Sequence, residues 1–273
     1  MADFLRLRHK ENILYQDLQD RVAIVTGSTT GIGKTVAIQL AENGSKVVVN
    51  GTNEERGIGV VEQIRSAGGD AVFFPADVSN SAQVSELVDF AVKTYGRLDL
   101  ACNNSGIEGR GLDTHTYAED TWDLTIGVNL TGIFLCMKYQ LTQMMKQYQK
   151  EGSEHFRAAI VNVSSIAGFV GGASPAYNAS KHGIHGLTKH AGIVYSKNNI
   201  RVNAVCPAVT RTSMVDRFIE TDPELVKKWA EMHPIGRFAE TDEVSAAVLW
   251  LLSKQASFVT GVALPVDGGW TIH

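Results

Sequence analysis

Side chains suited to proton transfer lie close together in one stretch of the chain, SSIAGFVGGASPAYNASKHG, residues 164–183. Ser174 followed by Pro175 is typical of a helix start, so Tyr177 and Lys181 fall about one turn apart on one helical face. A tyrosine phenol has a pKa of about 10, and lowering it by about 3 requires about 4 kcal/mol. Two positive charges in a partly buried cleft can supply that energy, and Lys181 provides one of them. The pair predicts acid–base chemistry in which Tyr177 takes a proton from an alcohol or returns it to a carbonyl oxygen.

Two adjacent serines, Ser164 and Ser165, end the apolar run before that helix. A hydroxyl at this place can hydrogen-bond the reacting oxygen. Because neighbouring strand residues face opposite ways, only one of the two can do so. A Tyr-x-x-x-Lys pair by itself is mostly a surface feature, so the interpretation depends on the rest of the chain.

A glycine-rich turn supports that interpretation. The segment VAIVTGSTTGIGKTVA places Gly27, Gly31 and Gly33 where the first predicted strand turns into the first helix. Residues without Cβ let the backbone approach a pyrophosphate, and the helix start offers free N–H groups and a positive dipole end. The spacing is G-x-x-x-G-x-G, not the general dinucleotide pattern G-x-G-x-x-G, and a purely structural turn is the alternative. Its position after the first strand of an alternating chain favours a dinucleotide site.

The end of the second strand bears on which dinucleotide binds. An acid there would accept from the ribose 2′-OH and select NAD, but Gly51 and Thr52 occupy this turn. Asn50, Thr52 and Asn53 can donate to phosphate oxygens, and Arg56 can reach back. We expect NAD(P)(H) as the cofactor, with a modest preference for NADP(H).

The elements that hold these residues alternate along the chain. We predict strands at residues 22–27, 46–50, 71–77, within 98–106, and at 158–165, 201–207 and 263–269. We predict helices at 32–43, 53–67 and 119–147 and one ending near residue 95, with Gly44 left-handed after the first. Since the strands are almost continuously apolar, the sheet must be covered on both faces. The expected fold class is α/β, a single Rossmann-type doubly wound parallel β-sheet with helices on both faces.

We find no linker or internal repeat, so we expect one domain over residues 20–273, after an N-terminal extension of residues 1–19. The segment of about residues 210–237 interrupts the alternation with polar helical turns. It follows a strand's carboxyl end, so we expect it to be a substrate lid. Asp222 is its expected N-cap, with Pro223 at the first helical position and Pro234 as a stop.

Composition excludes several partners. The 273 residues carry a formal net charge of −4, so no basic field attracts nucleic acid. No apolar run approaches the roughly 18 residues of a membrane span, and the N-terminus lacks the features of a secretory signal. The cysteines Cys102, Cys136 and Cys206 show no paired spacing, which argues against disulfides and for a cytoplasmic protein.

Three histidines, His182, His185 and His190, lie on one predicted helix. No His-x-x-x-His pair with an adjacent acid marks a zinc site, so we expect no metal and interpret them as surface or packing residues. His233 lies in the lid segment, where packing is again favoured over substrate contact.

Several motifs follow one another in a fixed order: TGSTTGIG, NNSG at residues 103–106, VNLTG, VNVSS, YNASK, IRVNAVCP and PVDGG. With them the chain resembles a classical short-chain dehydrogenase/reductase (SDR) over roughly residues 20–269. The resemblance implies an active site of Ser165, Tyr177, Lys181 and Asn129. In it, Asn129 holds a water that links Lys181 to solvent, and Lys181 also holds the nicotinamide ribose.

The resemblance further implies that Asp77 binds the adenine amine, Asn103 lines the adenosine side, and Val209 and Thr212 meet the carboxamide. The cofactor-binding residues expected on this basis are Gly27, Thr29, Thr30, Gly31, Ile32, Gly33, Gly51, Thr52, Asp77, Val78, Asn103, Ser105, Gly106, Tyr177, Lys181, Pro207, Val209 and Thr212.

The chain departs from the family pattern at three places. Ser105 replaces the usual Ala, and Ala208 replaces the usual Gly after Pro207. The family commonly has thirteen residues from serine to tyrosine, a spacing that Ser164 has, whereas Ser165 lies twelve before Tyr177. We choose Ser165, because it is followed by x-Ala-Gly and loop length varies more easily than strand-end geometry.

The predicted function is NAD(P)-dependent interconversion of a secondary alcohol and a ketone, with Tyr177 as general acid/base. Apolar residues such as Ile107, Ile166, Phe169 and Met214 suggest a small to medium, fairly hydrophobic substrate. The alternative is a catalytically silent dinucleotide-binding regulatory or scaffold protein, which has no need of the full catalytic set. The resemblance also implies a homo-oligomer, a tetramer or a dimer, with contacts near Trp270.

Overall fold

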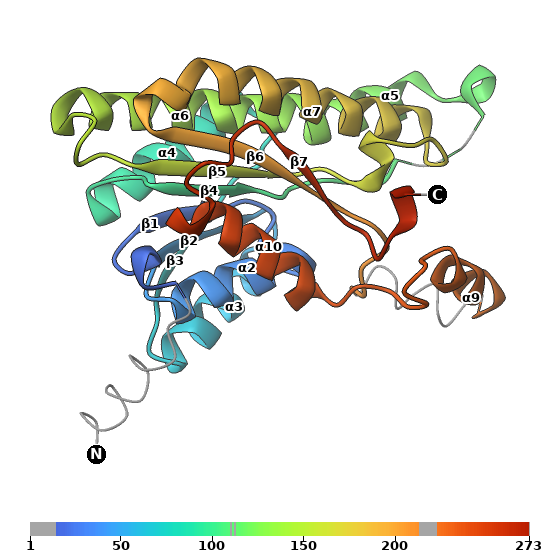
Figure 1. Cartoon of the computed structure of the whole chain (residues 1–273), viewed down its shortest axis with the longest axis horizontal. Helices are drawn as coiled ribbons and strands as arrows, with labels where there is room; N and C mark the ends of the chain where they lie inside the picture. The colour runs from blue at the N-terminus through green and yellow to red at the C-terminus, as the bar shows by residue number, and fades with distance from the viewer. Residues whose placement is uncertain (1–14, 110, 112, 213–222, 273) are drawn as a thin grey trace.

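Seven parallel strands form one sheet at the centre of the molecule (Figure 1). They are β1 (Val22–Val25), β2 (Lys46–Gly51), β3 (Asp70–Pro75), β4 (Leu100–Asn103), β5 (Ala158–Val163), β6 (Ile200–Pro207) and β7 (Ala263–Val266). Their spatial order is β3–β2–β1–β4–β5–β6–β7, so the order along the chain reverses beside β1. Ligands of open α/β sheets bind outside the carboxyl ends of the strands at such a point. The structure is a computed structural model and describes residues 15–109, 111, 113–212 and 223–272.

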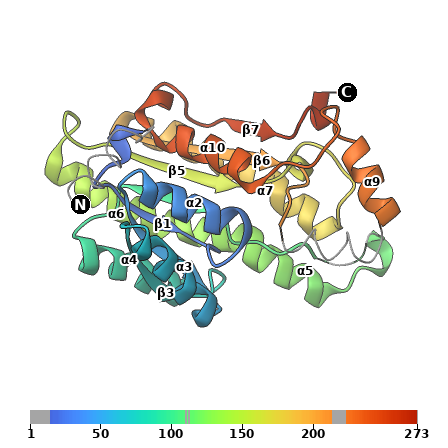
Figure 2. The same cartoon turned by 90° about the horizontal axis from the view of Figure 1, so that it is seen from below.

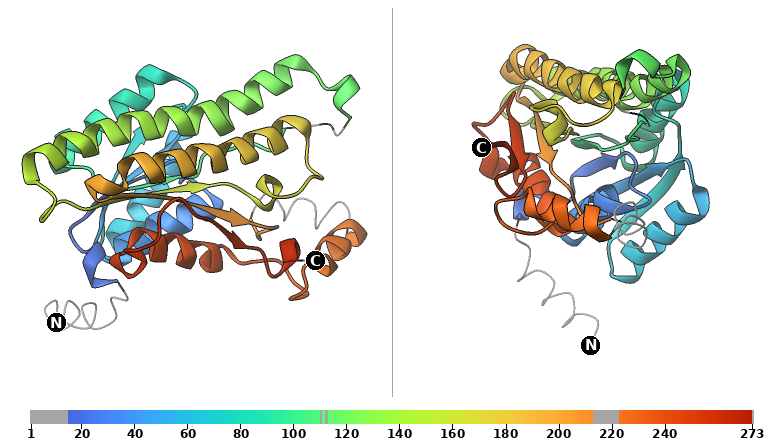
Figure 3. Two further views of the ribbon diagram at one scale, coloured as in Figure 1. Left: turned by 45° about the horizontal axis from the view of Figure 1, so that its top comes forward. Right: turned by 90° about the vertical axis from the view of Figure 1, so that its right-hand side faces the viewer.

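Helices cover both faces of the sheet (Figures 2 and 3). One face carries α2 (Gly31–Glu42), α3 (Glu54–Ser66) and α10 (Thr241–Leu252), and the other carries α4 (Ser81–Tyr95), α6 (Gly132–Glu151) and α7 (Pro175–Tyr195). Also assigned are α5 (Glu119–Ile126), α9 (Pro223–Glu231) and the short turns η1 (Gln16–Leu18), η2 (Thr114–Thr116), η4 (Ile166–Gly168), η5 (Ser196–Asn198), η6 (Lys254–Ala256) and η7 (Trp270–Ile272). Every position of β1, β4 and β5 is buried, because both sides of each strand pack against a helical layer. The predicted doubly wound α/β fold is confirmed.

The long helical stretch predicted over about residues 119–147 is present, and it contains a π-helical turn that was not predicted. The chain forms α5, then a π-helical turn (Gly127–Thr131), and then α6. A π turn inserts one residue into the helical repeat and re-aims the side chains near it. Here it buries Asn129 completely.

Two local predictions about helix ends are confirmed. Gly44 has φ +81° after α2, a conformation that suits glycine. The Ser174 hydroxyl caps α7 by accepting from the Tyr177 backbone N–H at 3.3 Å, with Pro175 at the first position. The cap fixes where α7 starts and so which way Tyr177 faces.

The two segments flanking the domain core are described in part. The last residues assigned to the N-terminal extension pack onto the domain, since Leu18 is buried and its carbonyl accepts from the Ser45 hydroxyl at 2.8 Å. In the segment predicted to be a lid, α9 begins at Pro223 and ends before Pro234, and it lies beyond the end of the sheet beside the C-terminus (Figure 1). The predicted roles of Met214 and Asp222 fall outside the described residues.

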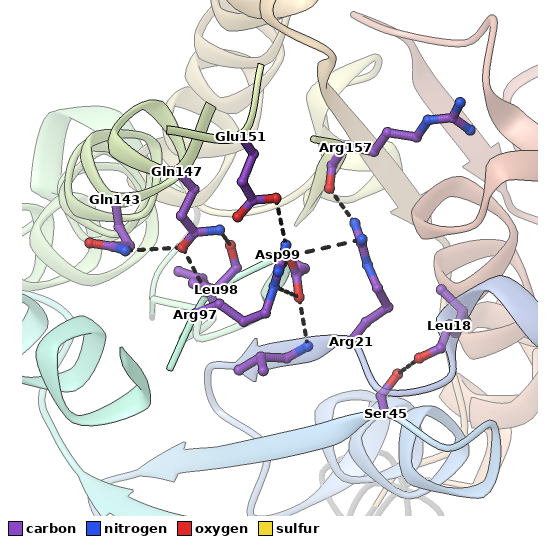
Figure 4. A network of polar contacts seen from close by, with 11 residues as sticks. Leu18, Arg21, Ser45, Arg97, Leu98, Asp99, Gln143, Gln147, Glu151 and Arg157 are labelled. Carbon is purple, nitrogen blue, oxygen red and sulfur yellow. Dashed lines mark hydrogen bonds and ion pairs between the residues drawn. The ribbon is translucent and has the colours of Figure 1, made fainter. Parts of the chain in front are cut away.

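A charged network lies at the amino ends of the central strands β1 and β4 (Figure 4). The buried carboxylate of Asp99 accepts from the Val22 N–H at 3.1 Å and from Arg97 Nε at 2.8 Å. Arg97 also pairs with Glu151 at 3.3 Å, and Arg21 lies 3.9 Å from Asp99. The network therefore joins the starts of β1 and β4 to the end of α6, far along the strands from the glycine turn.

Candidate active site

The glycine turn after β1 is tied to the loop after β4. Thr26 Oγ1 accepts from the backbone N–H groups of Asn104 (3.0 Å) and Ser105 (3.2 Å), and Asn104 Nδ2 donates to the carbonyls of Thr26 (3.1 Å) and Gly27 (2.9 Å). A Cβ at Gly33 would lie 2.4 Å from Asn104 Nδ2, and one at Gly27 would lie 2.9 Å from the Ser105 Cα. These glycines are thus required by the protein's own packing. Asn104 was missed from the sequence, although it is the second Asn of NNSG.

The start of α2 fits a pyrophosphate. Its N-cap, Thr30, makes no side-chain capping bond, and its first turn holds no acid. The first backbone N–H groups of α2 lie at the positive end of the helix dipole. Neither a capping side chain nor an acid of the first turn competes with a ligand for them. Thr30 is exposed and Thr29 half-buried, and Gly31 takes φ +55°. The predicted contacts of Thr29, Thr30, Gly31, Ile32 and Gly33 with a dinucleotide phosphate stay predictions, and the uncapped helix start is consistent with them.

The turn after β2 corrects one expectation about the adenosine ribose. Asn50 is completely buried, and its Nδ2 donates to the carbonyls of Phe74 (3.1 Å) and Ala76 (3.2 Å). It therefore has no N–H left to offer a phosphate. Asn53 caps α3 through its oxygen, and Arg56 is exposed.

Gly51 also meets a neighbour from the glycine turn. A Cβ there would lie 2.6 Å from Thr29 Cγ2. Any larger residue at this place therefore displaces the Thr29 side chain.

The residues expected at the adenine differ in their surroundings. Asp77 follows β3 half-buried, and its Oδ1 accepts from the Ser79 N–H (2.9 Å) and hydroxyl (2.7 Å). Val78 is buried against α6, where a Cβ at Gly132 would lie 2.8 Å from it. The contact of Asp77 with the adenine amine stays a prediction, whereas the Val78 side chain is used in packing.

The Asn103 side chain also lies elsewhere than predicted. Its side chain is completely buried and exchanges hydrogen bonds with Gln140 (2.8 and 3.1 Å) while donating to Asn162 at 3.0 Å. The amide therefore points into the layer below α6 and does not line the adenosine side.

The loops after β4 and β6 lie at the same end of the sheet as the glycine turn. A Cβ at the exposed Gly106 would lie 3.4 Å from Asn129 Oδ1 and 3.7 Å from Lys181 Nζ, so this loop runs beside the catalytic residues. Thr212, beyond the end of β6 at Pro207, approaches the glycine turn, since a Cβ at Gly31 would lie 3.3 Å from its methyl group. The Val209 carbonyl accepts from the Ala239 N–H at 3.1 Å. The structure therefore gathers the turns after β1, β4 and β6 at one edge.

At the end of β5 the structure separates the two serines. Ser164 is buried, and its hydroxyl donates to the Lys181 carbonyl at 3.1 Å. Ser165 is half-buried, hydrogen-bonds Tyr177, and has an oxygen that accepts from the Ala167 N–H at 3.2 Å. Ser165 is thus the serine that faces the phenol.

Burial dominates the electrostatics around Tyr177. Burial raises the pKa of Tyr177 above its ordinary value, the Ser165 hydrogen bond lowers it in part, and Glu108 raises it. The Lys181 ammonium lies 5.3 Å from the centre of the Tyr177 ring and donates to the Val163 carbonyl at 3.1 Å. Burial lowers the pKa of Lys181 to about 8. Burial is therefore the main reason why the pKa of Tyr177 lies above its ordinary value. The lowering expected from Lys181 and an oxidised nicotinamide ring together stays a prediction.

Asn129 clamps the loop after β4. Its Nδ2 donates to the Ile107 carbonyl and its Oδ1 accepts from the Ile107 N–H, both at 2.8 Å. The amide therefore has its main partners within the protein. The water predicted to link Lys181 to solvent through Asn129 stays a prediction.

Comparison with known proteins now decides the family. A family model described as Enoyl-(Acyl carrier protein) reductase matches residues 27–271. The chain belongs to the short-chain dehydrogenase/reductase family. It is 39% identical over 256 residues to 2,5-dichloro-2,5-cyclohexadiene-1,4-diol dehydrogenase of Sphingobium indicum, covering 93% of this chain and 98% of that protein. It is 39% identical over 262 residues to cyclohexanol dehydrogenase of an Acinetobacter species, covering 96% and 99%.

A solved structure agrees with this placement. An Agrobacterium tumefaciens protein, provisionally assigned as a 2-deoxy-d-gluconate 3-dehydrogenase and holding NADP, superposes with a TM-score of 0.85 at 29% identity, covering 95% of this chain and all of that one. This SDR protein is therefore an NAD(P)-binding oxidoreductase that acts on CH–OH groups of small molecules.

A carboxylate lies beside the catalytic groups of this SDR enzyme. Glu108 is exposed, and its backbone carbonyl accepts from the Ser174 hydroxyl at 3.2 Å, the same hydroxyl that caps Tyr177. Among the described residues it forms no ion pair. Sequence patterns gave no signal for it, because a single acid in a loop is ordinary.

His233 is a packing residue in the SDR structure. It is buried, its Nδ1 lies 2.8 Å from the Trp229 carbonyl, and its ring meets Trp270 edge-on at 4.7 Å. These contacts join the end of α9 to the C-terminal turn η7.

No group of three or more His, Cys, Asp or Glu in the part of the chain that the structure describes is arranged to hold a metal ion. No helix there is long and apolar enough to cross a membrane.

Proposed function

We propose that this SDR enzyme interconverts a secondary alcohol and a ketone, with Tyr177 as the general acid and base. The observation that carries the proposal is the convergence at the end of β5, where Ser165 hydrogen-bonds Tyr177 and Lys181 Nζ lies 5.3 Å from the ring centre. A regulatory protein that only binds a dinucleotide gains nothing from this arrangement. The silent alternative is therefore the weaker one.

Each residue has a role of its own in the proposed reaction, and Lys181 has a second role in holding the nicotinamide ribose. Ser165 donates to the substrate oxygen and holds it near the phenol. Tyr177 takes the hydroxyl proton during oxidation and returns it during reduction. Lys181 stabilises the phenolate by its charge, and Asn129 keeps the adjoining loop in place. When bound, the nicotinamide cofactor accepts or supplies the hydride.

The proposed cofactor preference is modest and towards NADP(H). Gly51 brings no acid to repel a 2′-phosphate, and Arg56 is exposed on the next turn. Thr52 and the Asn53 amide remain as donors, while Asn50 is excluded by its burial. The NADP held by the Agrobacterium structure is consistent with this preference.

The proposed substrate is a small to medium cyclic alcohol. The apolar side chains of Ile107, Ile166 and Phe169 follow β4 and β5, beside the catalytic groups, and Phe169 is exposed. Cyclohexanol and a cyclohexadiene diol appear in the names of two relatives. The Glu108 carboxylate adds a hydrogen-bond acceptor for a second hydroxyl.

We also propose a homo-oligomer in the cytoplasm, a dimer or tetramer. The outer faces of α6 and α7 expose Phe134 and Ile193 and enclose a groove of about 510 Å³ lined by Leu141, Met145 and Leu187. An apolar face of this kind on long helices suits a second copy. All three cysteines are free and buried, as a reducing compartment allows.

The test of the reaction is Tyr177→Phe with cyclohexanol and a panel of other cyclic alcohols and ketones. Loss of the phenol hydroxyl should reduce turnover by about 100- to 10,000-fold, while cofactor binding measured by fluorescence is retained. Tyr139→Phe is the matched control, since its hydroxyl bonds Ser81 at 2.8 Å on the surface. A Tyr177→Phe variant within a few fold of wild type would contradict the assignment.

A further inference from the structure

A buried polar cluster lies behind the catalytic groups. Ser164 at the end of β5, His185 on α7 and Cys206 on β6 meet there, all less than one-tenth exposed. His185 Nε2 is 3.1 Å from the Ser164 hydroxyl and 3.3 Å from Cys206 Sγ. None of the three belongs to the catalytic set.

The surroundings are shaped for the imidazole. A Cβ at Gly168 would lie 2.5 Å from His185 Nε2, so only glycine leaves room for the ring. Phe169 covers it, with ring centres 4.6 Å apart. The turn after Ser165 is therefore packed around His185.

Counting hydrogens assigns the direction of the contacts. The Ser164 hydroxyl has one hydrogen, and it is donated to the Lys181 carbonyl, which can only accept. Ser164 must then accept from His185, so Nε2 carries the proton of the neutral ring. Burial, together with the nearby His182, Lys189 and Lys181, lowers the pKa of His185 to about 4, which keeps the ring neutral around pH 7.

The cluster lies next to two of the predicted catalytic residues, Ser165 and Lys181. Ser164 precedes Ser165, and neighbouring strand residues face opposite ways, so fixing the first sets the direction of the second. Lys181 hydrogen-bonds two neighbouring residues at the end of β5. Its backbone carbonyl accepts from the Ser164 hydroxyl, and its Nζ donates to the Val163 carbonyl. A ring that orients Ser164 therefore acts on Ser165 and Lys181 together.

We propose that His185 is a positioning residue of this enzyme, which acts through the Ser164 hydroxyl to aim Ser165 at Tyr177 and to hold Lys181. The inference rests on the proposed function, because it assigns Ser165 and Lys181 to catalysis. It gives Ser164 a role of its own: one serine of the pair faces the reaction, and the other anchors it.

The first test is a double-mutant cycle that needs no activity. Ser164→Ala and His185→Leu are made singly and together, and their unfolding is followed by denaturant titration. The double variant should be about as stable as the less stable single variant, because both remove one interaction. His185→Gln, which keeps an N–H donor, should recover most of the stability. Additive losses in the cycle would overturn the proposal.

The second test separates positioning from stability. At a temperature where every variant is folded, Ser164→Ala should lower kcat for the best probe alcohol by about tenfold or more, with the cofactor Kd within about twofold of wild type. The limb of the pH profile that reports deprotonation of Tyr177 should move to higher pH, because the Ser165 hydrogen bond lowers the pKa of Tyr177.

The control is Ser45→Ala, which removes another buried hydroxyl that donates to a carbonyl, at Leu18. It should reduce stability and leave the pH limb in place. An unmoved limb in Ser164→Ala, with wild type active, overturns this inference alone. A wild type inactive with every probe alcohol overturns the proposed function, and this inference with it.

Discussion

The turn after β2 allows a sharp test of cofactor choice by adding the acid that it lacks. Gly51→Asp alone is a poor perturbation, because the new Cβ would lie 2.6 Å from Thr29 Cγ2. Thr29→Ser removes that methyl group and leaves Thr29 Oγ1, at 3.5 Å from the Cβ position, in ordinary contact. The variant to make is therefore Thr29→Ser with Gly51→Asp, and Thr29→Ser alone is its control.

The expected effect follows from one charge-assisted hydrogen bond. A carboxylate at Gly51 gains a bond to a ribose 2′-OH worth about 1.5–3 kcal/mol, and it repels a 2′-phosphate. Since 1.4 kcal/mol is about tenfold, the ratio of kcat/KM for NAD over NADP should rise by about ten- to a hundredfold. Cofactor Kd values from protein fluorescence should move in the same direction.

Three results would count against the reasoning. A ratio that stays within about twofold of the Thr29→Ser control would remove Gly51 from the ribose site. A wild type that rejects NADP would do the same for the proposed preference. Equal behaviour of Gly51→Asp with and without Thr29→Ser would show that the predicted clash is relieved at no cost.

The remaining predictions concern the pKa of Tyr177, the role of Lys181 and the stability that the Asp99 network contributes. Glu108→Gln should move the pH limb of alcohol oxidation to lower pH, by less than about one unit for an exposed carboxylate, because Glu108 raises the pKa of Tyr177; movement upward would contradict this. Lys181→Met should weaken both turnover and cofactor affinity, and unchanged affinity in titrations would remove its ribose contact. Asp99→Asn should lower the free energy of unfolding by on the order of 2 kcal/mol and spare activity at 25 °C, which denaturant titration and an alcohol assay would check.

The strands and most helices could be predicted from the sequence, because apolar runs and glycine stops are local signals. Gly44 and Ser174 show this best, since each ends or begins a helix by chemistry within a few residues. The π turn at Gly127–Thr131 could not be predicted in this way. Its residues suit an α-helix equally well, and the contact of Asn129 with Ile107 that accompanies the turn joins residues 22 positions apart.

The catalytic residues could be proposed from motif order, but their environments could not. Asn103 and Asn104 are adjacent, and only the packed layers decide that the first points at Gln140 and the second at Gly27. The direction of the Tyr177 pKa depends on burial and on the neighbouring Ser165 and Glu108, which are properties of the assembled site. Glu108 was missed for the same reason.

The bonds between Asn104 and the turn after β1 have a consequence for recombination. The nucleotide turn cannot be exchanged by itself, because the side-chain amide of Asn104 holds part of its shape. Asn104 lies 78 positions after Thr26 and 77 after Gly27 in the chain. A chimera that takes residues 26–33 from one parent and 103–106 from another would confront that amide with carbonyls placed for a different side chain. Crossover points that keep the two segments from the same parent should therefore yield folded nucleotide-binding hybrids more often than points that fall between them.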